Sequence, residues 1–345
     1  MRHPMGPMQP VFDGHNDVLL RATAEEIATG RDDGHLDVPR AKAGGLAAGI
    51  FAVFTPGAET EPVVTDDGWE DPLPPPLPDG AAAAHALQRA GRLFRLEQLG
   101  AVRVIRDVAD LDRCPEDGVL GAVLHLEGAE AIDPGLEALE LWYAAGLRSL
   151  GLVWSRPNAF GHGVAGRFPH SPDTGDGLTP AGRALVRRCN VLGVLVDASH
   201  LNLAGFDDLV RTSGAPLVAT HSCAHALAPA SRNLTDAQLD AIGASGGLVG
   251  ITFVVPFLRA DGQDDPDTPL STIVAHVRHV ADRIGVDHVA LGSDFDGATM
   301  PAALRSAREL PVLVEALRGG AFSEAELALI CHGNWQRVLA ACWHA

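Results

Sequence analysis

The sequence predicts an α/β protein and, within that class, a (β/α)8 barrel of the TIM type. Short apolar segments alternate with longer segments of helical periodicity along most of the 345 residues. The apolar segments are nearly continuous, which is typical of parallel strands covered on both faces. Eight such segments interleaved with helices favour a barrel. A doubly wound open sheet is the competing fold, but no GxGxxG motif follows a strand.

The predicted strands are rich in Val, Leu, Ile and Ala, and each is long enough to cross a barrel wall. In chain order they are 11–17, 46–54, 119–127, 147–154, 193–200, 216–221, 248–253 and 288–294. Helical spacing of apolar residues predicts helices over 81–99, 135–145, 179–192, 235–245, 270–284 and 323–331. Two of these begin with good N-terminal signals, Thr179-Pro180 and the near capping box that starts at Thr235.

We expect one domain, residues 1–345, because the strands and helices alternate without a boundary. A long insertion rich in proline and acidic residues, about 55–80, interrupts this pattern and contains the run DPLPPPLPDG. Such a segment is predicted to be a surface loop or extended spacer. A loop over the barrel mouth or a subunit contact is the alternative.

The chain is acidic, with 26 Lys and Arg against 44 Asp and Glu and a net charge of −18. Nucleic acid and anionic membranes would be repelled, so neither is an expected partner. The single lysine, Lys42, lies outside any GxxxxGK[ST] motif, which argues against a phosphate-loop protein.

The five cysteines are scattered and form no CxxC pair, which favours a reducing compartment over a disulfide framework. Residues 1–10 lack the apolar stretch of a signal peptide, and no apolar run is long enough to span a bilayer. A soluble, cytoplasmic protein is therefore expected.

Histidines and acids gather at the ends of the predicted strands. His15 and Asp17 close the first strand, Glu127 the third, His200 the fifth, His221 the sixth and Asp294 the eighth. In a barrel these C-terminal ends converge on one face. Imidazoles and carboxylates without a thiolate suit Zn²⁺ and similar ions, and a shared carboxylate allows two. The spacing therefore predicts a metal site.

Six short motifs occur in order: DGHND (13–17), HLEG (125–128), DASH (197–200), THS (220–222), SRN (231–233) and GSDFDG (292–297). Together they resemble the metallodipeptidase family that includes renal membrane dipeptidase, from Val11 to the segment 333–338. The resemblance implies an amidohydrolase-like barrel with two zinc ions. It also implies a small dipeptide substrate, tolerance of a D-residue at its C-terminal position, and a possible homodimer.

Carried onto this sequence, the resemblance gives each strand-end residue a role. His15 and Asp17 would bind the first zinc, His200 and His221 the second, and Glu127 together with a hydroxide would bridge the two. Asp294 matches the catalytic aspartate that takes a proton from water and passes it to the leaving amine. Asp296, in the same DFD sequence, is the alternative acid. Arg232 matches the arginine that holds the substrate carboxylate.

One position departs from the family pattern. Many relatives end the fourth strand with a Thr-His pair, whose histidine contacts the scissile carbonyl, whereas this chain has Trp154 at that place. Either His162 reaches back from the loop to contact this carbonyl, or the indole N–H of Trp154 donates to it instead. Arg156 and Asn158, in the same segment, are further candidate substrate contacts.

The remaining candidates are weaker. We expect His225 and Cys223 to be structural, His125 to support a ligand carboxylate or pack in the core, His276 and His279 to be solvated, and Asn334 to cap the last helix. The prediction is a zinc dipeptidase. Hydrolysis of N-acyl amino acids or lactams is the first alternative, and a non-catalytic binding or maturation protein is the second.

Overall fold

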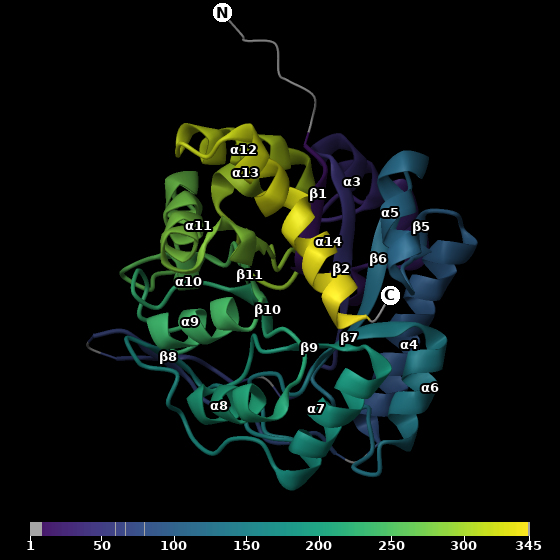
Figure 1. Cartoon of the computed structure of the whole chain (residues 1–345), viewed down its shortest axis with the longest axis vertical. Coiled ribbons are helices and arrows are strands. Elements are labelled where there is room, and N and C mark those ends of the chain that lie inside the picture. Colours follow the sequence, from purple (N-terminus) through teal and green to yellow (C-terminus); the bar gives the residue numbers. More distant parts are fainter. Residues whose placement is uncertain (1–8, 59, 66, 79, 344–345) are drawn as a thin grey trace, which may run out of the picture.

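The computed structural model describes residues 9–58, 60–65, 67–78 and 80–343, and its centre is a barrel of parallel strands (Figure 1). The strands follow one another in the order β1, β2, β6, β7, β9, β10, β11 and β12. Their bounds are Val11–Asn16, Leu46–Phe54, Leu120–Glu127, Leu147–Gly151, Leu195–Asp197, Val218–Ser222, Leu248–Ile251 and Val289–Leu291. All eight predicted strands are present, so the predicted fold class is confirmed.

The barrel closes between its last and first strands near their C-terminal ends. The amide of Asp294 donates to the carbonyl of His15 at 2.9 Å, and that of Asp17 donates to Phe295 at 2.8 Å. Below them, buried Asp13 accepts from the Ser293 amide at 2.6 Å and the Ser293 hydroxyl at 2.8 Å. These contacts hold the His15 and Asp294 segments side by side.

A short ninth strand, β5 (Val102–Val104), pairs with the start of β6 in parallel and lies outside the barrel order. The sequence did not predict it. At three residues it carries too little periodicity to be distinguished from a loop.

Helices surround the strands. They are α1 (Val18–Arg21), α2 (Ala24–Thr29), α3 (Val38–Gly44), α4 (Ala81–Gln98), α5 (Val108–Asp117), α6 (Glu137–Ala145), α7 (Pro180–Leu192), α8 (Leu203–Thr212), α9 (Asp236–Ala244), α10 (Val255–Leu258), α11 (Leu270–Ile284), α12 (Leu310–Gly319), α13 (Glu324–Ala328) and α14 (Asn334–Cys342). Single 3-10 turns lie at Val286–His288, Ala302–Leu304 and Ala307–Glu309, and a π turn at Leu329–Gly333 joins α13 to α14.

Two predicted helices begin at the caps that the sequence indicated. Thr179 caps α7, and Thr235 forms a capping box with Gln238 at α9. The helix predicted at 323–331 begins at Glu324 with Ser323 as its N-cap, and it continues through the π turn into α14. Helices α3, α5 and α8 were not predicted, although Asp37, Asp107 and Asn202 cap them with their side chains.

Two predictions about single residues are wrong. Asn334 does not cap α14, because its amide donates to the carbonyls of Val286 and Val289 at 2.7 and 2.9 Å. His276 is buried rather than solvated; it accepts from the Ala224 amide at 3.1 Å and contacts the Leu258 carbonyl at 3.0 Å. His279 is partly exposed and pairs with Asp236 at 2.9 Å.

The lower half of the barrel interior is filled by one apolar cluster. Strand residues such as Phe12, Ile50 and Val123 meet Trp335 and Leu339 of α14, which crosses the barrel end in Figure 1. Trp335 stacks on Phe12 at 5.3 Å between ring centroids and donates to the Leu291 carbonyl at 3.0 Å. Gly14 permits this approach, since a Cβ there would lie 2.5 Å from the Trp335 ring. Helix α14 therefore closes this end and leaves the other for a site.

The insertion at about 55–80 contains β3 (Val63–Val64) and β4 (Trp69–Asp71), which form a small antiparallel sheet with β8 (Gly166–Phe168). The Trp69 indole donates to the Gly262 carbonyl at 2.9 Å. Both partners belong to loops that follow C-terminal strand ends, so the insertion contacts the rim opposite α14. Val63 and Val64 remain exposed.

Within the described residues, no helix has both the length and the apolar character that crossing a membrane requires. Organisation as one domain over residues 1–345 stays a prediction.

Candidate metal centre

Five predicted ligands meet at the C-terminal end of the barrel. His15 lies in β1 and Asp17 directly after it, Glu127 ends β6, His221 lies in β10, and His200 follows β9. Four of them are at most 5% exposed, and the His200 side chain is 11% exposed. The sequence argument that strand ends converge therefore places these residues correctly.

A single oxygen of Glu127 lies at the centre of the cluster. Glu127 Oε1 is 3.6 Å from His15 Nε2, 3.0 Å from His200 Nε2 and 3.6 Å from His221 Nε2. On one side, His15 Nε2 is 3.7 Å from Asp17 Oδ2. On the other, the Nε2 atoms of His200 and His221 are 3.1 Å apart. This is close to the roughly 3.3 Å expected between two nitrogens on one tetrahedral ion.

Buried polar atoms without protein partners test whether a cation fits here. Both ring nitrogens of His15 and Asp17 Oδ1 are buried and have no hydrogen-bond partner among the described residues. Leaving such atoms unpaired is costly, and metal coordination would satisfy them. The ligand types and the orphaned atoms therefore fit a divalent metal.

The charges at the site also favour a cation. Although burial opposes it, the carboxylates of Glu127, Asp17 and Asp294 raise the pKa of His15 to about 10. Burial raises the pKa of Glu127 well above its ordinary value. A positive charge is thus favoured at this position, and a metal ion would supply it in place of protons.

The other two histidines are neutral. Burial, and then Arg232 and His15 as nearby cations, hold the pKa values of His200 and His221 well below the ordinary value. Neutral imidazole is the form that binds metals.

Asp294 lies beside this cluster on the loop after β12. It groups with His15 and Asp17, with ligand atoms within 4.8 Å of one another. Burial, and then the nearby Asp17, raise the pKa of Asp294 to about 7 in the protein alone, although His15 opposes the shift. Asp296, the alternative acid, is directed elsewhere, since it accepts from the amides of His35 and Leu36 at 2.9 and 3.2 Å and pairs with Arg31.

Arg232 reaches the cluster from the loop after β10. Its Nη1 donates to Ser222 Oγ at 2.8 Å and its Nη2 to the His221 carbonyl at 2.9 Å. The Nε–H is buried and has no partner within the described part of the chain. The guanidinium is thus fixed against the candidate metal ligands and keeps a donor for a further anion.

Trp154 forms a wall beside the ligands. Its ring is half-buried, 4.8 Å from Phe54 and 5.8 Å from His200 between centroids. His162 is half-buried between Gly161 and Gly163, and the Gly163 backbone pairs with Leu201, next to His200. Trp154 therefore lies beside His200, and the backbone directly after His162 pairs with the residue directly after His200.

Arg156 and Asn158 make internal contacts, contrary to their expected role as substrate contacts. Arg156 is fully buried, pairs with Glu130 at 3.0 Å and donates to the Thr55 carbonyl at 3.0 Å. The Asn158 amide donates to the Leu152 carbonyl at 2.9 Å, and its oxygen accepts from the Phe160 amide at 2.8 Å. Both hold the loop that carries Trp154.

The other candidates are structural. His225 contacts the His170 carbonyl at 2.9 Å, and Cys223 is buried with its pKa raised by burial. His125 is fully buried beneath the ligands, with Nδ1 2.8 Å from Ser149 Oγ.

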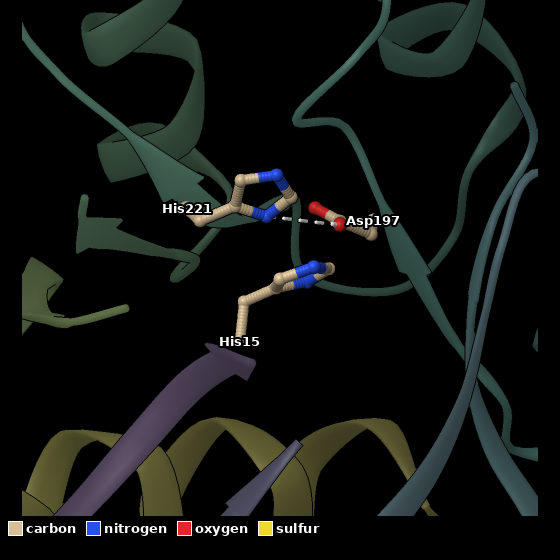
Figure 2. Close-up of side chains that lie close together, drawn as sticks. All are labelled: His15, Asp197 and His221. Atoms are coloured by element: carbon tan, nitrogen blue, oxygen red, sulfur yellow. Dashed lines mark ion pairs between the residues drawn. The ribbon is translucent and has the colours of Figure 1, made fainter. Parts of the chain in front are cut away.

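Sequence reasoning missed Asp197. Its carboxylate lies beside His15 and His221, as Figure 2 shows, with Oδ2 3.9 Å from His221 Nδ1. The residue begins the DASH motif, but only His200 of that motif was considered. The available signal was that Asp197 lies inside the predicted apolar strand 193–200, where a buried carboxylate needs hydrogen-bond partners.

Comparisons with known proteins show the family of this chain. Residues 3–344 match the family model "Membrane dipeptidase (Peptidase family M19)". The chain is 50% identical over 244 residues to an uncharacterized protein from the pqqA 5' region of Klebsiella pneumoniae, covering 71% of this chain and 90% of that protein. It is 28% identical to the dipeptidase tcpJ of Claviceps purpurea, covering 95% and 76%.

Solved structures are similar over nearly the whole chain. A metallo peptidase from Rhodobacter sphaeroides, liganded with a phosphinate mimic of the dipeptide L-Ala-D-Ala, superposes with a TM-score of 0.93 at 46% identity, covering 98% of this chain and 100% of that chain. The dipeptidase AC, a metallo peptidase of family M19, superposes with a TM-score of 0.94 at 48% identity and the same coverage.

The barrel and its ligand cluster define a metal-dependent hydrolase. The chain belongs to the membrane dipeptidase family, peptidase family M19, and is a metallo dipeptidase. The alternative of a non-catalytic binding protein is therefore not retained.

Proposed function

We propose that this enzyme is a binuclear zinc dipeptidase that hydrolyses small dipeptides with a free C-terminal carboxylate, including L-Xaa-D-Xaa. The observation that carries this proposal is Glu127 Oε1, which lies 3.0–3.6 Å from three histidine nitrogens. Glu127 would be shared between one ion held by His15 and Asp17 and another held by His200 and His221. His/carboxylate donors without thiolate favour zinc among the available metals.

When bound, the two ions would supply Lewis-acid polarisation of the peptide carbonyl and a water acidic enough to react near neutral pH. The chain's own residues would do the rest. Asp294 would accept the proton of the attacking water on a carboxylate oxygen and deliver it to the departing amine. Its pKa of about 7 in the protein alone would be lowered by neighbouring cations, which favours the base role first.

Arg232 would hold the substrate carboxylate. Its Nε–H is the unused donor, and the Nη contacts to Ser222 and His221 fix its position relative to the metal ligands. A carboxylate bound there would lie at a set distance from the cluster, which would select dipeptides over longer peptides.

Trp154 and His162 would contact the substrate on the side of His200. Trp154 presents an aromatic face there, at the position where the family resemblance implies a histidine. The stereochemical part of the proposal is supported by the Rhodobacter sphaeroides relative, which was solved with a mimic of L-Ala-D-Ala.

A substrate screen at defined zinc content tests the proposal. L-Xaa-D-Xaa and L-Xaa-L-Xaa dipeptides would be compared with N-acyl amino acids and lactams, each at one and two equivalents of zinc. We expect dipeptides to have the highest kcat/KM and the second equivalent to be required for full activity. A higher kcat/KM for N-acyl amino acids would refute the dipeptide assignment. A cytoplasmic location and a homodimer also remain predictions.

A further inference from the structure

Asp197 lies close enough to His15 and His221 to resemble a metal ligand (Figure 2), yet its oxygens are already occupied. Oδ1 accepts from the Ser199 amide at 3.0 Å, the Ser199 hydroxyl at 2.6 Å and the Thr220 amide at 2.8 Å. Oδ2 accepts from the Thr220 hydroxyl at 2.6 Å. The carboxylate is 3% exposed, so these contacts replace solvent.

The Thr220 hydroxyl connects Asp197 to the metal ligand His221. Thr220 Oγ1 is 2.6 Å from Asp197 Oδ2 and 2.8 Å from His221 Nδ1, and Thr220 is completely buried. A hydroxyl has one proton to donate. Since Oδ1 of the carboxylate already accepts two backbone N–H groups, Asp197 acts as an acceptor, and the hydroxyl proton points to Oδ2. Thr220 can then only accept from His221.

This arrangement fixes which nitrogen of His221 carries the proton. If Thr220 accepts, Nδ1 must hold the proton of the neutral ring, and the lone pair is left on Nε2. Nε2 is the atom 3.1 Å from His200 Nε2 and 3.6 Å from Glu127 Oε1. The ring therefore presents its lone pair to the metal position.

We propose that Asp197 and Thr220 are positioning residues for the metal, acting as a carboxylate–hydroxyl–imidazole relay that sets the tautomer and orientation of His221. The relay rests on the proposed role of His221 as a ligand. His200 has a simpler arrangement, with Ser155 Oγ 3.0 Å from its Nδ1 and no carboxylate acceptor behind that hydroxyl in the described contacts. A hydroxyl group therefore contacts Nδ1 of each of the two imidazoles that would hold this ion.

The test is a Zn²⁺ titration of the full chain after metal removal, using a competing chromophoric chelator to measure both dissociation constants. Thr220→Val removes the hydroxyl at nearly constant volume, and Thr220→Ser keeps it. Thr252→Val is the matched control, because Thr252 is also buried at a strand end but contacts the Val254 amide instead. His221→Ala reports on the ligand itself.

We expect Thr220→Val to weaken one of the two zinc-binding steps by about 10–100-fold. Thr220→Ser and Thr252→Val should bind as the wild type does. Asp197→Asn should weaken the same step. The double variant Thr220→Val/Asp197→Asn should be no weaker than the more affected single variant, because both changes break one chain of contacts. Thermal unfolding of each metal-stripped variant verifies that it folds.

Wild-type zinc affinity in Thr220→Val, together with weakened binding in His221→Ala, would overturn the relay while leaving the proposed ligands intact. Unchanged binding in His221→Ala would instead overturn the proposed ligand set, and the relay with it. Equal weakening in Thr252→Val would also overturn the relay, since the effect would then follow from any buried Thr→Val change.

Discussion

Asp294 combines an uncommon backbone conformation with a side chain at the ligand cluster. Its φ is 62°, in the left-handed region that non-glycine residues rarely occupy, and its amide is held by the His15 carbonyl. Strain of this kind persists where surrounding contacts enforce it, often at functional sites. The adjacent Ser293–Asp13 contacts provide that enforcement.

Asp294→Asn should lower kcat by about 100-fold or more, because the amide cannot accept and return a proton. Steady-state kinetics with a dipeptide and the zinc content of the purified variant are the measurements, and two zinc ions should remain. Asp296→Asn is the comparison. It disturbs the Arg31 ion pair, so the melting temperature should fall, whereas kcat should fall much less than in Asp294→Asn. A larger loss of kcat in Asp296→Asn than in Asp294→Asn would assign the proton-transfer role to Asp296.

Arg232→Lys should raise KM by about 10–100-fold, because it replaces a charge-assisted hydrogen bond from a rigid guanidinium with a flexible ammonium. The control is a dipeptide amide, which lacks the carboxylate. The kcat/KM of the wild type should be lower for the amide than for the dipeptide. The kcat/KM of the variant should differ little between the two substrates. If the variant discriminates against the amide as strongly as the wild type, Arg232 does not hold the carboxylate.

At the scale of elements, the loop after β7 depends on a buried ion pair. Arg156 lies 5.6 Å from the Trp154 ring centre and 5.8 Å from that of Phe54, while pairing with Glu130. The sequence suggested a substrate contact because Arg156 is close to Trp154 in the chain. Only the fold shows that the Arg156 guanidinium lies next to the rings of Trp154 and Phe54.

Arg156→Met should lower the free energy of unfolding by about 3–5 kcal/mol, because Glu130 would be left buried without its partner. Denaturant unfolding measures this, and KM should rise as Trp154 loses its support. The matched control is Arg188→Met, which breaks the exposed Arg188–Glu140 pair and should cost at most about 1 kcal/mol. Similar losses in the two variants would contradict the structural role given to Arg156.

Helix α11 is joined to the β10 loop through His276. Burial lowers the pKa of this imidazole to about 4, below the unfolded value of 6.5. Between these values the unfolded chain binds the extra proton, so the stability that the neutral ring contributes is lost as the pH falls from about 6.5 toward 4.

His276→Gln keeps an acceptor and a donor but does not titrate. The variant should be less stable than the wild type at pH 7.5, and the difference should shrink by about 1–2 kcal/mol at pH 5. Urea unfolding at both pH values is the measurement. A difference that does not change with pH would contradict the assignment.

At the scale of the whole molecule, the site brings together carboxylates from segments that are far apart in the chain. Carboxylates from the β1, β6 and β12 segments lie together in the interior, and their mutual repulsion destabilises the fold unless cations are present. Metal binding should therefore stabilise the entire barrel.

Chelation should abolish dipeptidase activity and lower the melting temperature, and zinc should restore both, since an ion that binds only the folded chain stabilises it by mass action. Activity assays and calorimetry on the same samples measure the two effects. His15→Ala should show a smaller zinc-dependent rise in melting temperature. Full activity in the stripped protein would contradict the metal-dependent mechanism.

The sequence by itself determined the fold class, the eight strands and the five strand-end residues that meet at the candidate metal centre. These features depend on local periodicity and on a general property of parallel barrels, the convergence of C-terminal strand ends. The net charge of −18 said little about the site, since few of the 44 Asp and Glu residues lie there.

Only the tertiary structure decided how the side chains are used. Glu127 offers one oxygen to three histidines, Asp197 supports His221 through Thr220, Arg156 lies beneath Trp154, and His276 is buried. The physical reason is that such contacts join segments far apart in the chain. Local spacing places a residue on a strand end, but side-chain direction, burial and competing partners decide whether it binds a metal, a substrate or another part of the protein.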